Sequence, residues 1–148
     1  MKNTRAVAEL TLLDTLYQQG FAVPKPIAAN VERSGLCYRA DLIIERVAGA
    51  EDLVAKLRQT AMSHTQWQTL GQCIAGFHRH GVYHADLNAK NILLADDKFY
   101  LIDFDRGEFR TPNSSWQQAN LQRLLRSFRK ELAKQPELAF SNADWQLL

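Results

Sequence analysis

The chain has 148 residues, of which 46% are hydrophobic and 23% are charged, and its formal net charge is +2. This composition is typical of a globular chain with one core, and the length is short for two full domains. The small charge and the lack of an RNA- or DNA-reading motif argue against a nucleic-acid partner.

Cys37 and Cys73 have no paired spacing and predict buried thiols in a reducing compartment. No set of His, Cys and acidic residues has the spacing of a zinc site. No apolar run is long enough to export the chain or to cross a bilayer, so the expected location is the cytoplasm, with contact at a membrane surface left open.

The first predicted element is a helix over residues 5–19, which ends at Gly20 and is followed by two prolines. Its leucines share one face at 100° per residue, and Glu9 projects from the middle of that face. This carboxylate is either an acidic residue favoured near a helix start by the helix dipole, or a functional group.

Residues 27–31 and 38–44 predict two strands, joined by a turn at residues 32–35. On its residues alone, the segment that follows, Glu45 to Gly49, is either an ordinary loop from strand to helix or a hinge with a functional role. A short helix is then expected over residues 51–58.

A longer helix begins at a capping box formed by Ser63 and Gln66 and ends at Gly81. Its apolar residues, Trp67 among them, recur at helical spacing and predict a core helix. This helix leads directly into the polar motif at the centre of the chain.

The central motif begins at His84, where His84, Asp86 and Asn91 have the spacing H-x-D-L-x-x-x-N. Asp103 follows an apolar run a dozen residues later. Phosphoryl transfer requires a carboxylate that orients and deprotonates the attacking hydroxyl, and oxygen ligands that hold Mg²⁺ against the phosphates. Asp86 fits the first role, and Asn91 and Asp103 fit the second.

The segment between these ligands predicts a hairpin, with strands at 92–94 and 100–102 around a turn at 95–98. Such a hairpin would bring Asn91 and Asp103 together at one end. Each polar residue alone has a structural alternative, and for His84 a hydrogen bond that braces the loop is the favoured role. The spacing of all of them together favours a site.

A strongly amphipathic helix is predicted from Trp116 to Lys134. One face is leucine-rich, and the other carries Arg123, Arg126, Arg129, Lys130 and Lys134. This basic face is either the solvated back of a core helix or a contact with anionic lipid or a phosphorylated glycolipid. Between the motif and this helix, Arg106 and Arg110 are open to two interpretations: contact with an acceptor anion, or a structural role as surface charges or ion-pair partners of Asp105 and Glu108.

Residues 84–94 and 102–110 resemble the small-molecule branch of the protein-kinase-like superfamily. They are most similar to the bacterial lipopolysaccharide-core kinases that phosphorylate 3-deoxy-D-manno-octulosonic acid (Kdo). The run Asp103-Phe104-Asp105-Arg106-Gly107 looks like the Kdo kinases, because protein kinases and aminoglycoside phosphotransferases place Gly where this chain has Asp105. The segments at 4–9 and 23–27 match as well, so the resemblance covers nearly the whole chain.

The resemblance implies an α+β, protein-kinase-like fold, with a partial N-terminal lobe over residues 1–47 and a mainly helical C-terminal lobe over residues 48–148. It implies transfer of phosphate from ATP, with Mg²⁺, to the 4-hydroxyl of Kdo on a lipid A precursor. The implied location is the cytoplasmic face of the inner membrane, and Arg123, Arg126, Arg129 and Lys130 are candidates for contact with its anionic surface.

The resemblance also implies roles for single residues. Asp86 is the base, Asn88 stands where many protein kinases carry a catalytic-loop lysine, and Asn91 and Asp103 hold the metal. The adenine is held by the backbone of Glu45 and Val47 in the hinge between the lobes, above an apolar floor at Leu93.

Glu9 is implied to pair with a lysine that contacts the phosphates. That lysine and its glycine-rich loop are expected before residue 1, because Lys2 is only seven positions ahead of Glu9.

Two alternatives remain open. One is another small-molecule kinase of the aminoglycoside or choline type, which usually has Gly after Asp-Phe and an acidic acceptor cleft. The other is a nucleotide-binding remnant without catalytic activity.

Overall fold

The computed structural model describes residues 5–34 and 37–148, so Lys2 lies outside the described residues. Its elements in chain order are α1 (Arg5–Gln18), β1 (Pro26–Ser34), β2 (Cys37–Ile44), β3 (Glu51–Asp52), α2 (Leu53–Gln59), α3 (His64–Arg79), β4 (Val82–Tyr83), the 3-10 turn η1 (Ala89–Asn91), β5 (Ile92–Ala95), β6 (Lys98–Leu101), β7 (Glu108–Phe109), α4 (Ser114–Lys134) and α5 (Asn142–Leu147). Helices combined with short antiparallel strands confirm the α+β class.

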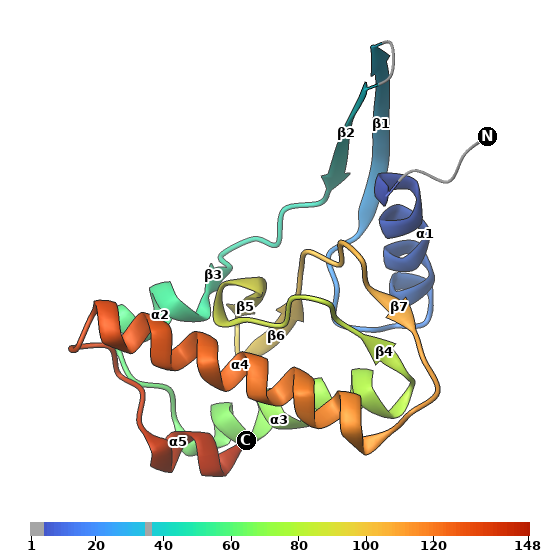
Figure 1. Cartoon of the computed structure of the whole chain (residues 1–148). Helices are drawn as coiled ribbons and strands as arrows, with labels where there is room; N and C mark the ends of the chain where they lie inside the picture. Colours follow the sequence, from blue (N-terminus) through green and yellow to red (C-terminus); the bar gives the residue numbers. More distant parts are fainter. Residues whose placement is uncertain (1–4, 35–36) are drawn as a thin grey trace.

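The described strands form three small antiparallel sheets, β1-β2, β3-β5-β6 and β4-β7. In Figure 1 the β1–β2 hairpin projects away from the body beside α1, while the β5–β6 hairpin lies in the middle of the molecule and α4 crosses in front. Within the described part of the chain, no helix combines the length and the apolar character needed to span a bilayer.

Helix α1 ends as the sequence predicts. Gly20 has a φ of +79°, and its N–H donates to the Tyr17 carbonyl at 3.0 Å, while the Phe21 N–H donates to the Leu16 carbonyl at 3.0 Å. This pair of bonds is a Schellman motif, which needs a left-handed residue that glycine supplies without strain. Leu12, Leu13 and Leu16 of α1 are buried in the hydrophobic core.

The predicted turn at residues 32–35 is wrong in its position. Glu32 pairs with Arg39 and Ser34 pairs with Cys37, so β1 continues through residue 34. Residues 35 and 36 lie outside the described residues. The polar residues at 32–34 continue the strand and do not form a turn, because a hairpin that projects from the body can carry polar residues in solvent. Glu32 is exposed, as this explanation requires.

Helix α3 has both predicted ends. Ser63 Oγ accepts from the Gln66 N–H at 3.1 Å and the Ser63 N–H donates to Gln66 Oε1 at 2.9 Å, which completes the capping box. After the helix, Gly81 has a φ of +74°, and its carbonyl accepts from the Arg110 N–H at 2.7 Å. Gly81 therefore both ends α3 and joins β4 to the segment that leads into α4.

The core is closed by aromatic rings from distant parts of the chain. Phe128 of α4 stacks on Phe140, with ring centroids 4.6 Å apart, and Trp67 of α3 meets Phe128 at 5.7 Å. No element is predicted after Pro136, yet α5 forms there behind a capping box, in which Ser141 Oγ accepts from the Asp144 N–H. The Ser-x-x-Asp spacing was a usable signal for this helix.

The described cysteine fits the prediction in part. Cys73 is half-buried, and burial raises the pKa of its thiol to about 11, so it is a poor nucleophile. The side chain of Cys37 lies outside the described part of the structure.

We predict that Gly81→Ala destabilises the fold by about 2 kcal/mol or more, since φ is positive and a Cβ would overlap the Arg110 carbonyl. The matched control is Gly76→Ala within α3, where a Cβ meets nothing within 4 Å. That change should stabilise by up to about 1 kcal/mol. Urea unfolding of both variants measures the difference, and equal stabilities would contradict the prediction.

Candidate active site

The β5–β6 hairpin brings Asn91 and Asp103 to one end, as predicted. Ile92 pairs with Leu101, and the Ile102 N–H donates to the Asn91 carbonyl at 3.0 Å. The turn is tighter than the predicted 95–98, because only two residues lie between the strands. These are Asp96 and Asp97, and their φ angles of 46° and 59° are those of a two-residue hairpin loop.

His84 braces the motif from within the protein, the structural role that was favoured for it. Its Nε2 lies 2.9 Å from the Ile102 carbonyl, and its Nδ1 accepts from the Asp86 N–H at 3.2 Å. These partners assign a neutral ring with the proton on Nε2. Burial lowers the pKa of His84, which also favours the neutral form.

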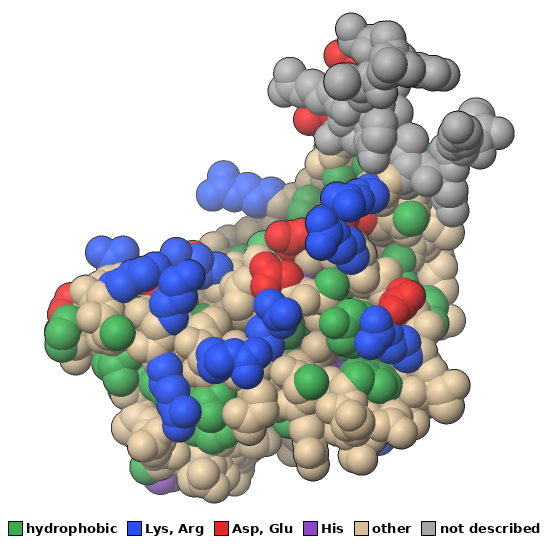
Figure 2. Space-filling model, viewed as in Figure 1, with side chains coloured by type: hydrophobic (Ala, Val, Ile, Leu, Met, Phe, Trp, Pro, Cys, Tyr) green, Lys and Arg blue, Asp and Glu red, His purple; other side chains and the backbone are tan. Residues whose placement is uncertain are grey.

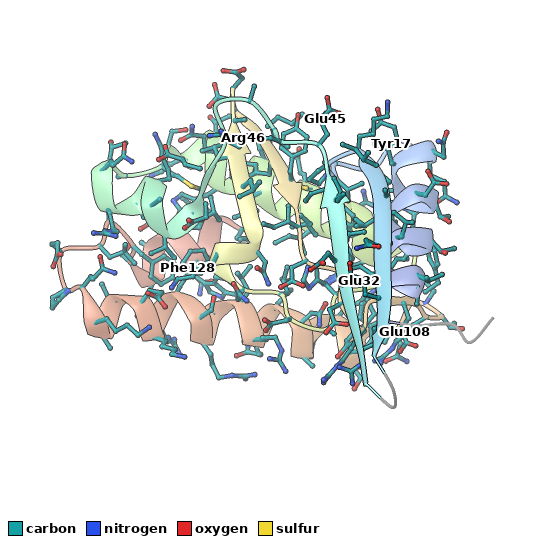
Figure 3. All side chains as sticks on the ribbon, turned by 90° about the horizontal axis from the view of Figure 1, so that it is seen from above. Tyr17, Glu32, Glu45, Arg46, Glu108 and Phe128 are labelled. Carbon is teal, nitrogen blue, oxygen red and sulfur yellow. The ribbon has the colours of Figure 1, made fainter. Side chains whose placement is uncertain are left out.

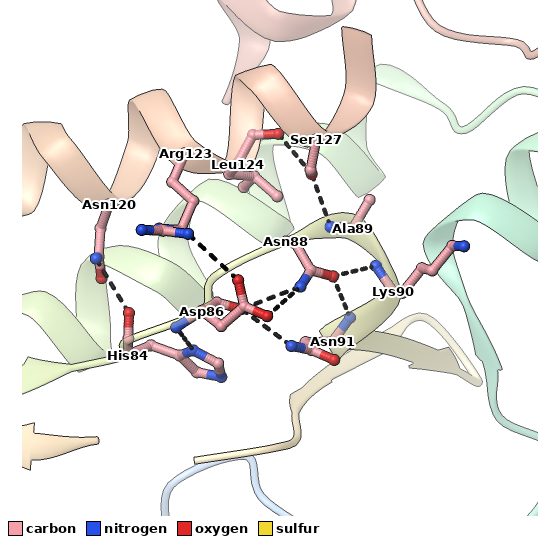
Figure 4. A network of polar contacts seen from close by, with 10 residues as sticks. All are labelled: His84, Asp86, Asn88, Ala89, Lys90, Asn91, Asn120, Arg123, Leu124 and Ser127. Carbon is pink, nitrogen blue, oxygen red and sulfur yellow. Dashed lines mark hydrogen bonds and ion pairs between the residues drawn. The ribbon is translucent and has the colours of Figure 1, made fainter. Parts of the chain in front are cut away.

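The loop from Asp86 to Asn91 is held by its own side chains (Figure 4). Asn88 Oδ1 accepts from the N–H groups of Lys90 and Asn91, at 2.9 and 3.1 Å, and Asn88 Nδ2 donates to Asp86 Oδ2 at 3.0 Å. Asn91 Nδ2 donates to the Asp86 carbonyl at 3.0 Å. That bond leaves Asn91 Oδ1 without a hydrogen bond in the described residues, free to face a metal ion.

Asp86 is exposed, at 57% of its side-chain surface, and lines a cavity of about 380 Å³ between its loop and α4. Helix α4 holds this loop in place (Figure 4). Ser127 Oγ accepts from the Ala89 N–H at 2.9 Å and donates to the Leu124 carbonyl at 2.7 Å. Arg123 Nη1 lies 3.5 Å from Asp86 Oδ1. The candidate base therefore faces open space with both carboxylate oxygens positioned.

Three carboxylates meet beside the end of the hairpin. Glu9 of α1 is half-buried, and its pKa is raised by burial and then by the charges of Asp103 and Asp105. A hydrogen bond from the Phe104 N–H opposes this shift. No lysine or arginine in the described residues forms an ion pair with Glu9. Such a cluster favours a cation, because close like charges disfavour ionisation.

The oxygen atoms of Asn91 and Asp103 that have no hydrogen bond within the described residues are suitable ligands for a magnesium ion that also binds phosphates. Across residues 5–34 and 37–148, no group of three His, Cys, Asp or Glu side chains could hold a metal by itself. Mg²⁺ usually takes only one or two protein oxygens and completes its shell with phosphate and water. The unpaired Asn91 Oδ1 and the exposed Asp103 carboxylate match this requirement.

The predicted hinge residues lie on the connection from β2 to β3, where Figure 3 labels Glu45. The Glu45 N–H donates to the Lys25 carbonyl at 2.8 Å, and the Val47 carbonyl accepts from the Ala50 N–H at 3.3 Å. The Glu45 carbonyl and the Val47 N–H make no hydrogen bond within the described residues. The Glu45 carbonyl is thus available to accept from the amino group of adenine, and the Val47 N–H is available to donate to the ring nitrogen on the same edge.

Leu93 is half-buried on β5, directly opposite Tyr100 on β6. A cavity of about 550 Å³ behind the hinge is lined by Glu45, Val47 and Tyr100, but not by Leu93, Glu9 or Asp103. The structure therefore does not join the predicted hinge and metal residues in one described cavity.

The segment between the hairpin and α4 is held by local contacts. Arg110 pairs with Glu108 at 2.6 Å and lies over the Tyr83 ring, 3.5 Å from its centroid, while Arg106 lies 3.8 Å from Asp105. Of the two interpretations of these arginines, the structure shows the ion pairs. The β4–β7 pairing that includes Glu108 was not predicted, because each strand has only two residues.

Two residues that support the loop were also missed. Asn120 is buried, and its Nδ2 donates to the His84 carbonyl at 3.1 Å, while Ser127 holds Ala89. Their signal was present in the sequence, since both are polar and lie seven residues apart, two helical turns, beside the leucines of α4.

We predict that stability depends on His84 below about pH 6.5. The unfolded chain takes up a proton near the ordinary pKa of 6.5, whereas burial lowers the pKa in the fold. The contribution of His84 to the free energy of unfolding is therefore fully present above that pH. It is lost as the pH falls, by at most about 1.4 kcal/mol per pH unit. Urea unfolding between about pH 8 and about pH 5.5 should show a smaller slope for His84→Gln. Part of the slope should remain, because burial also lowers the pKa of His78. An unchanged slope would contradict this role.

Comparison with known proteins identifies relatives of the whole chain. A sequence model of the lipopolysaccharide kinase (Kdo/WaaP) family matches residues 1–148. The chain is 47% identical to a 3-deoxy-D-manno-octulosonic acid kinase of Mannheimia succiniciproducens, over 98% of this chain and 62% of the relative. It is 44% identical to the kinase of that description from Vibrio parahaemolyticus, over 99% of this chain and 61% of the relative. The chain thus spans about three fifths of the length of these relatives.

A solved structure described as WaaP in complex with acyl carrier protein has the same fold. It matches with a TM-score of 0.69 at 17% identity, over 96% of this chain and 63% of the other. At this identity the likeness shows the fold alone, and it confirms the kinase-like architecture predicted from the motif. With the family match over its full length, the chain belongs to the lipopolysaccharide kinase (Kdo/WaaP) family.

Proposed function

We propose that the protein transfers phosphate from ATP to a sugar hydroxyl, namely the 4-hydroxyl of Kdo in a Kdo-containing lipid A precursor, during lipopolysaccharide core synthesis. The observation that carries the proposal is that Asp86 lines an open cavity, while Asn91 and Asp103 flank the two strands of the adjoining hairpin. The curated relatives support the acceptor class, since they are described as Kdo kinases.

Asp86 would accept the proton of the attacking hydroxyl. Its Oδ2 receives a hydrogen bond from Asn88, and its Oδ1 lies beside Arg123, so the carboxylate is oriented before substrate binds. A general base must lie within hydrogen-bond reach of the proton that it removes. Because Asp86 is exposed and lines the cavity, an acceptor hydroxyl can come within this reach, and Asn88 would act by positioning the base.

Asn91 and Asp103 would hold Mg²⁺, which supplies neutralisation of charge on the phosphates when bound. Glu9 would pair with a lysine that contacts the same phosphates. The Glu45 carbonyl and the Val47 N–H would bind adenine, with Leu93 as its apolar floor. The division into lobes at residue 47 remains part of this proposal.

The surroundings of Asp86 bear on the alternatives. Cationic aminoglycoside or choline acceptors call for an acidic cleft, whereas the cavity beside Asp86 carries more basic than acidic side chains.

A peripheral location on the cytoplasmic face of the inner membrane, through Arg123, Arg126, Arg129 and Lys130, is compatible with a lipid-linked acceptor. A non-catalytic remnant would bind Mg·ATP without transfer to Kdo-lipid, which a thermal-shift measurement beside a transfer assay distinguishes.

We predict that Asp86→Asn lowers kcat for transfer to Kdo-lipid by about 10³-fold, because the variant keeps the shape but not the base. The melting temperature should change little, since the side chain is exposed. Asp14→Asn, an exposed change on α1, is the matched control and should retain activity. If Asp86→Asn retains turnover, the residue has no part in the mechanism.

We further predict that Asp103→Asn and Asn91→Ala each raise the Mg²⁺ concentration for half-maximal transfer about tenfold or more, because the first removes the negative charge of one metal ligand and the second removes the other ligand. Asp97→Asn at the opposite end of the same hairpin serves as control, since an amide keeps the oxygen that accepts from Gln66. Magnesium titrations of transfer and of thermal stabilisation by ATP measure the effect. Equal titrations in all three variants would exclude this metal site.

A further inference from the structure

We infer that the cavity between the Asp86 loop and α4 binds an anionic group of the acceptor, a phosphate or carboxylate that is not itself phosphorylated, and thereby selects acceptors with several negative charges. The inference rests on the proposed transfer at Asp86 and adds a binding site for a second part of the acceptor. Neither the family match nor the sequence motif assigns this cavity.

The cavity has an excess of positive charge. Five cationic side chains line it, against the two carboxylates of Asp86 and Glu131. The cations are Lys90, Arg123, Arg126, Lys130 and Lys134. Figure 2 shows Lys and Arg side chains gathered over α4 on this face. A cleft lined mainly by side chains of one sign raises the local concentration of counter-ions, so this cavity attracts anions.

The carboxylates of the cavity are already paired. Glu131 accepts from Lys134 at 3.0 Å and lies 3.7 Å from Lys90, and Asp86 lies beside Arg123. Lys90 therefore helps to hold Glu131.

Arg126 and Lys130 also line the cavity, and neither forms a hydrogen bond or an ion pair within the described residues. The charge of Lys130 contributes to the lowered pKa of Glu131, after those of Lys134 and Lys90. Arg126 and Lys130 are one turn apart on α4, so both reach one ligand group. Arginine offers paired N–H donors that fit phosphate or carboxylate oxygens, and lysine adds a mobile point charge. These two side chains form the anion site of the proposal.

The direction of α4 sets how an acceptor would lie. Positions 123, 126, 130 and 134 fall in one stripe of the helix, and the stripe is about 16 Å long. It begins beside Asp86 and extends away from it. A hydroxyl at Asp86 and an anion at Arg126 and Lys130 would therefore belong to different parts of one extended acceptor, longer than a single sugar ring.

Arg129 provides the matched control within the same helix. It is exposed like Arg126 and Lys130 but does not line the cavity. The sequence grouped Arg129 with the other cations as one basic face, whereas the structure assigns only some of them to the cavity. A membrane contact would use Arg129 as well, and an acceptor site would not.

The test compares the double variant Arg126→Gln/Lys130→Gln with Arg129→Gln. For the bisphosphorylated Kdo-lipid A precursor, the double variant should raise KM about tenfold and leave kcat within about twofold, since charge-assisted hydrogen bonds are lost away from the base. Affinity for this acceptor without ATP, measured by calorimetry, should weaken by the same factor. With the acceptor in detergent and no bilayer present, the proposed membrane contact of Arg129 has no part in either measurement, so Arg129→Gln should match the wild type in both.

Modified acceptors identify the bound group. If it is a phosphate, the wild type should bind the dephosphorylated precursor about as weakly as the double variant binds the intact one. If it is the sugar carboxylate, the same result should appear with the carboxyl-reduced precursor instead. Acceptor affinity that is equal in the wild type and the double variant would overturn the inference.

Phosphatidylglycerol vesicles without acceptor test the membrane alternative. An equal loss of vesicle and acceptor binding in the double variant and in Arg129→Gln would replace the acceptor site by a lipid surface. Because acceptor binding is measured without nucleotide, a failure of phosphate transfer alone would refute the proposed function and leave this site standing. Unchanged melting temperatures would show that the variants fold.

Discussion

The rest of the site depends on two hydrogen bonds made by the buried ring of His84. One nitrogen binds the end of the β5–β6 hairpin and the other binds the backbone of Asp86, so a single side chain fixes the loop relative to the hairpin. Asn120 extends the connection to α4 through the His84 carbonyl. Because the ring is buried and neutral, both bonds are formed away from competing water.

Different positions of helix α4 have three different roles. Phe128 packs in the aromatic core, and Asn120 and Ser127 hold the backbone of the Asp86 loop. Arg123 and Arg126 lie along the cavity at the surface. The position of the candidate base relative to these cations is therefore fixed by core packing, since the helix that carries the charges is also the helix that supports the loop.

Charge is divided between the two sides of the Asp86 loop. Glu9, Asp103 and Asp105 gather at the end of the hairpin, whereas basic side chains predominate in the cavity against α4. Opposite surroundings of this kind favour different ligands, a cation on one side and an anion on the other. This division supports the proposal of metal and nucleotide beside the hairpin and a negatively charged acceptor along α4.

Local patterns determined most of the elements and the order of the polar motif. The helix that ends at Gly20, the capping box at Ser63 and the hairpin between Asn91 and Asp103 all follow from interactions among residues close in the chain, and each was predicted. The turn at 32–35 was placed wrongly because polarity marks exposure as well as turns. Only the tertiary structure placed Ser127 against Ala89, 38 residues away, and formed a cavity between α4 and the loop. Such contacts depend on how helices pack over a shared core, and no spacing along the chain encodes that packing directly.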